Sequence, residues 1–197
     1  MTVSVWIAFL SYALVTAYTP GPNNIISLNT TTKYGLKKSA PLRVGIGVGF
    51  ILIMIITNGL TFFLGASEPS IIHYLKYIGA VYILYLAIKV ALSKPIQEEG
   101  KTTRIPEFWT GFFLQFMNVK VILYGITAVS TFFLPYYSSI YDLIWFISIL
   151  VANSLIAIWI WGLLGYALKN FINKHRILFN TIMALILLES AFSILLS

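Results

Sequence analysis

The sequence predicts an all-α integral membrane protein with six transmembrane helices, for three reasons. The composition is 59% hydrophobic and only 10% charged, whereas a soluble domain carries about 25% charged residues. Apolar segments long enough to cross a bilayer follow one another along the chain. Basic residues are concentrated in alternate linkers between these segments. We therefore expect one membrane domain over residues 1–197.

Six apolar segments account for the expected helices. Each has about the 20 residues that a helix needs to cross a hydrocarbon core about 30 Å thick. They cover residues 3–28, 42–64, 71–91, 108–134, 142–168 and 177–196.

Lysine and arginine are unevenly distributed among the linkers. The linkers that follow the first, third and fifth segments are basic, whereas residues 65–70 and 135–141 contain neither. Cytoplasmic loops are enriched in these residues, so we expect a multi-pass protein of the cell (inner or plasma) membrane, with both termini outside the cytoplasm. The net charge of +7 is then explained by the basic cytoplasmic loops, and no nucleic-acid partner is expected. The loop cations are Lys33, Lys37, Lys38, Arg43, Lys94, Lys101, Arg104, Lys169, Lys174 and Arg176.

A polar cytoplasmic linker, 93–107, divides the chain into halves 1–92 and 108–197 with three segments each. Because three is odd, a second half that resembled the first would be inverted in the membrane, as in many secondary transporters. Both halves begin with a segment that has polar side chains at mid-depth, which leaves an inverted three-helix repeat open. These side chains are Asn23 and Asn24 in the first segment and Gln115, Asn118 and Lys120 in the fourth.

Residues 17–26, AYTPGPNNII, interrupt the first segment. Pro20 and Pro22 have no N–H group to donate to the carbonyl groups four residues earlier, and Gly21 lets another group approach the backbone. Proline also suits the first position of a helix. We therefore predict that the first helix is discontinuous, with one half ending near Tyr18 and the other beginning near Pro22.

The second half-helix would direct the free N–H groups of Asn23 and Asn24 into the break. A helix N-terminus carries about half a positive elementary charge and is a natural site for a carboxylate. Irregular backbone at this depth is tolerated only where it is buried in protein or lines a cavity. The break is therefore a candidate anion site. A proline kink that shapes packing and binds nothing is the alternative.

Two charged residues lie deep inside apolar segments. At about 1.5 Å per residue, Lys120 is about 18 Å into the fourth segment, where a lysine costs about 2.5–3.5 kcal/mol to insert. Glu189 reaches a similar depth in the sixth segment, which permits a buried ion pair with Lys120. As the one deep carboxylate, Glu189 is the candidate for proton coupling. A packing ion pair, or a glutamate that reaches the outer water, is the alternative.

No feature of the sequence indicates a metal, a cofactor or a nucleotide. Cysteine is absent and the two histidines lack an acidic cluster, so no metal site is expected. Gly45, Gly47 and Gly49 have the wrong spacing for a nucleotide-binding loop and favour close helix packing instead. No P-loop is present, so we expect no ATP hydrolysis.

Two stretches resemble the LysE/RhtB superfamily of amino-acid exporters, and the resemblance extends over nearly the whole chain. They are TPGPNN at 19–24 and FFLQFMNVKVILYGITAVSTFFLP at 112–135. The stretch at 112–135 is most similar to the cysteine/O-acetylserine exporter branch. The family's Asn-Pro-Lys corresponds to Asn118, Val119 and Lys120, and the valine removes the physical demand for a break in the fourth helix. Glu189 is not part of the family pattern.

The resemblance implies a secondary-active exporter of small neutral amino acids, of the cysteine/O-acetylserine type, driven by protons and without a cofactor. Its expected partners are the amino-acid substrate, protons and the lipid bilayer; the oligomeric state, including a homo-oligomer, is left open. The alternatives are a structural or assembly subunit and an integral-membrane enzyme. An enzyme is disfavoured because the loops hold no Ser/His/Asp grouping. The candidate substrate-binding residues are Pro20, Gly21, Pro22, Asn23, Asn24, Asn118 and Lys120.

Overall fold

The computed structural model describes residues 1–64 and 107–196, together with single positions at 77, 81, 84, 85, 87, 88 and 90–92. The predicted third segment and the linker 93–107 therefore lie largely outside the described residues. Every regular element in the described part is helical. In chain order the elements are α1 (Val3–Tyr18), α2 (Pro22–Leu64), α4 (Phe108–Leu114), η1 (Gln115–Met117), α5 (Val119–Ala128), η2 (Val129–Phe133), α6 (Ile140–Ala167), α7 (Lys169–Lys174) and α8 (Arg176–Leu196).

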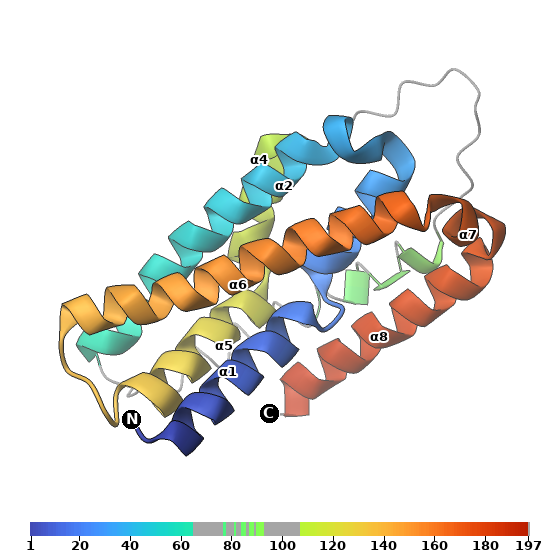
Figure 1. Cartoon of the computed structure of the whole chain (residues 1–197). Helices are drawn as coiled ribbons and strands as arrows, with labels where there is room; N and C mark the ends of the chain where they lie inside the picture. The colour runs from blue at the N-terminus through green and yellow to red at the C-terminus, as the bar shows by residue number, and fades with distance from the viewer. Residues whose placement is uncertain are drawn as a thin grey trace.

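The predicted break in the first helix is confirmed. α1 ends at Tyr18, Thr19 is extended with φ −61° and ψ 136°, and α2 begins at Pro22. The expectation that this half-helix ends near residue 28 and is followed by a loop is wrong. α2 continues to Leu64 and changes direction at Gly35, whose φ of 80° and ψ of 168° are accessible to glycine and strained for other residues. In Figure 1 the chain turns back at this point.

The fourth segment is also broken, although it has no proline at this position. The helices Phe108–Met117 and Val119–Phe133 meet at 60°, and Asn118 between them has the non-helical angles φ −91° and ψ 85°. The carbonyl group of Asn118 begins α5 by accepting from the N–H group of Val121 at 2.9 Å. The valine at 119 therefore does not restore a continuous helix.

Membrane-spanning length is found in part of the described chain. α2 and α6 are each long and apolar enough to cross a bilayer, and the bent α4–α5 pair passes the same criterion as one span. α1 is a shorter apolar helix of 16 residues. The count of six spans and the inverted repeat stay predictions.

Glycines allow the helices to approach one another at backbone distance. A Cβ atom on Gly45 would lie 1.9 Å from the carbonyl oxygen of Phe108, and one on Gly111 would lie 2.2 Å from that of Leu42. These two glycines join α2 to α4 from both sides. Gly47 and Gly49 also lie against neighbouring helices, so the predicted packing role of the three α2 glycines is confirmed.

An aromatic core fixes α1 against α5 and α6. Phe9, Phe133 and Phe146 are fully buried, and the rings of Phe9 and Phe146 stack with their centroids 4.2 Å apart. Figure 1 shows α1, α5 and α6 running alongside one another. This packing brings the end of α1 close to the start of α5, where both helix breaks occur.

Candidate functional site

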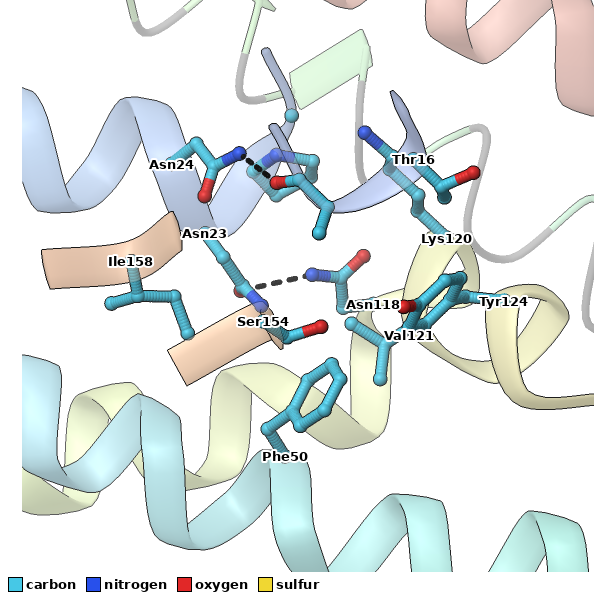
Figure 2. A pocket seen from close by; sticks show the side chains of 13 residues that line it. Thr16, Asn23, Asn24, Phe50, Asn118, Lys120, Val121, Tyr124, Ser154 and Ile158 are labelled. Carbon is cyan, nitrogen blue, oxygen red and sulfur yellow. Dashed lines mark hydrogen bonds between the residues drawn. The ribbon is translucent and has the colours of Figure 1, made fainter. Parts of the chain in front are cut away.

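The two helix breaks are joined by three amide side chains. Asn23 and Gln115 form a reciprocal pair, with each amide donating to the other at 2.9 Å. The Nδ2 atom of Asn118 donates to the Oδ1 atom of Asn23, also at 2.9 Å (Figure 2). All three side chains are buried. The first turn of α2 is thereby held against the start of α5.

Side chains satisfy the carbonyl groups that the proline break leaves free. Asn24 reaches back across the break and donates to the carbonyl groups of Ala17 at 2.8 Å and Thr19 at 3.0 Å. The indole N–H of Trp161 on α6 donates to Tyr18 at 3.2 Å, which takes the place of the N–H that Pro22 lacks. The carbonyl groups of Ala17, Tyr18 and Thr19 are therefore satisfied within the protein, as a membrane interior requires.

The Lys120 side chain lies directly over Gly21. Its Nζ atom donates to the carbonyl group of Thr19 at 3.2 Å, and a Cβ atom on Gly21 would lie 3.0 Å from the same Nζ. An ammonium group has three N–H donors, so this bond leaves donors for a ligand. The buried ion pair with Glu189 that the sequence permitted is not present, and Glu189 is exposed.

The first turn of α2 offers free backbone N–H groups beside the lysine. The first backbone bond of the helix is donated by Ile25 to Gly21, at 2.9 Å. Within the described part of the chain, the N–H groups of Asn23 and Asn24 have no acceptor. Pro22 has no N–H group, so these two are the donors that the helix N-terminus presents.

A pocket lies where these groups meet, with about 390 Å³ of empty space that includes the open solvent at its mouth. Phe50, Tyr124 and Ile158 provide apolar surface, and Ser154 adds a hydroxyl group (Figure 2). The lining residues are Thr16, Ala17, Gly21, Pro22, Asn23, Asn24, Phe50, Asn118, Lys120, Val121, Tyr124, Ser154 and Ile158.

Most of the residues predicted for the site converge on this pocket, although they are about 100 positions apart in the sequence. Pro20 and Glu189 do not line it. The sequence placed Gln115 at mid-depth and Tyr124 one helical turn after Lys120, on the same face of the helix, but neither was among the predicted site residues. Ser154 and Trp161 were not predicted either. No local signal marks these last two, because each acts through a contact with a distant helix.

A second cation, Arg43, was expected in a cytoplasmic loop, and that expectation is wrong because its side chain is buried in α2. Arg43 is 1% exposed. Its guanidinium group donates to Thr31, to Ser39 at 2.7 Å and to the carbonyl group of Leu36 at 2.7 Å. It lies 4.6 Å from the ring centroid of Trp159 on α6. Arg43 therefore ties together the two parts of α2 on either side of Gly35.

Apolar helices of membrane-spanning length surround a small pocket between two broken helices, and amide and ammonium groups are part of its lining. This arrangement is typical of a membrane transporter. The chain belongs to the LysE type translocator family, whose model matches residues 14–197. Family membership indicates a membrane-embedded transporter rather than an enzyme.

Similar proteins carry a more specific name. The cysteine/O-acetylserine efflux proteins of Escherichia coli K12 and of Escherichia coli O157:H7 are each 38% identical to this chain over 194 residues, or 97% of either chain. The protein of the same name from Escherichia coli O1:K1 is equally similar. No solved structure matches this chain.

Proposed function

We propose that this protein exports small neutral amino acids, of the cysteine and O-acetylserine type, from the cytoplasm across the cell membrane. The observation that carries the proposal is the pocket at the two breaks, where unbonded N–H groups of Asn23 and Asn24 lie beside the Lys120 ammonium group. The relatives' names support the substrate class.

The carboxylate of the substrate binds at the first turn of α2 in this proposal. The N–H groups of Asn23 and Asn24 donate to it, and the positive end of the helix dipole favours its charge. Lys120 supplies a second positive contact. Gly21 makes this possible because the absence of a side chain there leaves space for Lys120 to lie over the break.

The walls of the pocket favour a small, uncharged side chain. Phe50, Tyr124 and Ile158 restrict the space, and Lys120 is the one charged residue among those that line it. A basic side chain would meet Lys120 without an acidic partner, whereas an acidic one would compete with the carboxylate for the same donors. Either would bind less well than a neutral side chain.

The proton gradient is the proposed driving force, with Glu189 as the coupling residue and the two halves of the chain rocking about the pocket. Glu189 is the carboxylate in the sixth apolar segment and lies on α8. Glu189→Gln should abolish export driven by a pH gradient and preserve counterflow, which needs no net proton movement. Glu107→Gln, at an exposed carboxylate that begins α4, should change neither. Gradient-driven export at the parental rate in Glu189→Gln would remove Glu189 from the proposal.

Counterflow in proteoliposomes tests the function directly. Vesicles that contain the purified protein are loaded with unlabelled amino acid, and uptake of labelled cysteine, O-acetylserine, serine, lysine or glutamate is measured. We expect exchange of the small neutral members only. Asn23→Ala should reduce exchange by at least about tenfold, because it loses the amide that holds the two breaks together. Parental exchange by a normally inserted Asn23→Ala variant would refute the site.

A further inference from the structure

One acceptor in the pocket has no partner. The Asn118 side chain is 1% exposed, and within the described part of the chain its Oδ1 atom has no hydrogen bond. An unsatisfied buried polar atom is unfavourable, so a donor that reaches it is bound favourably. Asn118 lines the pocket, and Figure 2 shows its oxygen turned away from Asn23. The oxygen is covered in this structure, and it is an unused acceptor for a donor that enters the pocket.

The orientation of this amide is imposed by a chain of hydrogen bonds. The carbonyl group of Gly111 can only accept, so the nitrogen of Gln115, at 3.2 Å, must face it. The same nitrogen donates to Asn23, which fixes the oxygen of Asn23. That oxygen then requires the nitrogen of Asn118. The remaining atom of Asn118, its oxygen, is left for the pocket.

We infer that the Asn118 oxygen accepts the α-ammonium group of the substrate, and that Gln115 is the positioning residue that keeps this oxygen facing the pocket. The inference rests on the proposed function and adds how the substrate's amine is recognised. In an α-amino acid the ammonium and carboxylate groups share one carbon atom. The amide of Asn118 is bonded to the side chain of Asn23, and both residues line the pocket. The acceptor for the ammonium group therefore lies in the same pocket as the residue whose backbone N–H group is the proposed carboxylate donor.

This assignment makes the α-amine a requirement for binding. A hydrogen bond to a charged group contributes about 1.5–3 kcal/mol, which corresponds to a factor of about 10–150 in affinity. A molecule that has the same side chain and carboxylate but no amine should bind more weakly by that factor. 3-Mercaptopropanoate is such a molecule, because it has the thiol side chain and carboxylate of L-cysteine but no α-amine.

The test compares these two molecules as competitors of labelled L-cysteine counterflow under reducing conditions. The measured quantity is the ratio of their half-inhibitory concentrations, which does not depend on how much protein is inserted. For the parental protein we expect a ratio of at least about 10. In Asn118→Leu the ratio should approach 1, because the ammonium contact is lost while the carboxylate contacts remain.

Two further variants separate recognition from structural damage. Gln115→Leu should lower the ratio several-fold, because Asn118 is then free to rotate. Asn58→Leu is the matched control: Asn58 is a buried amide that also has an unbonded Oδ1 atom, but it does not line the pocket. Its ratio should equal the parental one.

The outcomes distinguish the two proposals. If the parental protein exchanges no amino acid, the proposed function fails. If it exchanges cysteine but Asn118→Leu keeps the parental ratio, the assignment of Asn118 is overturned and the exporter stands. If Asn118→Leu does not insert, an unchanged ratio in inserted Gln115→Leu overturns the positioning role in the same way.

Discussion

Lys120 and Arg43 are both basic side chains in the interior of the helical bundle, and their surroundings differ. Arg43 donates three hydrogen bonds to groups of its own helix and is covered by Trp159. Lys120 donates one, to Thr19, and lines a pocket. Neither has an acidic partner at bonding distance within the described part of the chain.

The difference shows how a membrane interior holds a cation for structure and for binding. A charged group away from water must be hydrogen-bonded, and neutral oxygens can serve as the acceptors. Three N–H donors of Arg43 are bonded to such oxygens, and its Nε–H group has no acceptor among the described residues. Arg43 does not line the pocket, so it is not presented to a ligand there. The Lys120 ammonium keeps unused donors on the pocket side, so it is the cation that a substrate can reach.

The largest effect should follow from Arg43→Leu. It leaves the acceptors on Thr31, Ser39 and Leu36 without their donor, which we expect to destabilise the protein by about 3 kcal/mol. Thermal unfolding in detergent measures this loss. The inserted fraction should keep the parental ratio of half-inhibitory concentrations for cysteine and 3-mercaptopropanoate. A change in that ratio would mean that Arg43 contributes to the site.

Lys120→Met should reduce exchange without lowering thermal stability, the reverse of what we expect for Arg43→Leu. Cysteine exchange should fall by about 30-fold, the loss of one contact to a charged group, while thermal stability stays the same or rises because a poorly paired charge is removed. Lys169→Met, at an exposed position on α7, is the control and should leave exchange unchanged. A stability loss in Lys120→Met as large as that in Arg43→Leu would end the distinction between the two cations.

Gly35→Ala tests the turn that Arg43 secures. The backbone angles at Gly35 are strained for any other residue, so we expect a loss of about 1–2 kcal/mol, even though no atom lies within 4 Å of the added Cβ. Gly59 also has open space around it but is helical. Gly59→Ala should therefore be neutral or stabilising, and equal effects at both positions would refute the strain.

Thr31→Val should have the smallest effect. It removes one of the acceptors of Arg43 and keeps the shape of the side chain, at an expected cost of about 1 kcal/mol. Chemical unfolding of the purified protein measures this value. In the background of Arg43→Leu the same substitution should cost less, because the bond is already lost. Strict additivity of the two substitutions would show that Thr31 and Arg43 act independently.

The sequence predicted the α1–α2 break because its cause is local. Proline lacks an N–H group wherever it occurs, so Pro20 and Pro22 restrict the backbone without help from other helices. The break at Asn118 has its side-chain contact with Asn23, which is 95 positions away in the sequence. Gln115 also bonds to Asn23 and therefore acts through the same tertiary contact. No rule on neighbouring residues reveals such a break, and the valine at 119 pointed away from it.

Residues 29–41 show the opposite error. Their polar and basic composition favoured a loop, but Thr31 and Ser39 are buried with Arg43, and Thr32 donates to the carbonyl group of Gly165 on α6 at 3.0 Å. Their polar groups are satisfied within the protein. The Lys120–Glu189 pair, which the sequence left possible, does not form. Position along a helix gives depth, whereas the direction of a side chain around the helix axis depends on packing.

The two hydrogen bonds of the Asn24 side chain hold α1 and α2 at a fixed angle across the break. One amide holds Ala17 and Thr19, the residues that close the first helix, while its own backbone belongs to the second. The angle between the two helices is therefore set before a ligand binds. The break loses little conformational entropy on binding, so this cost does not reduce the affinity for the ligand.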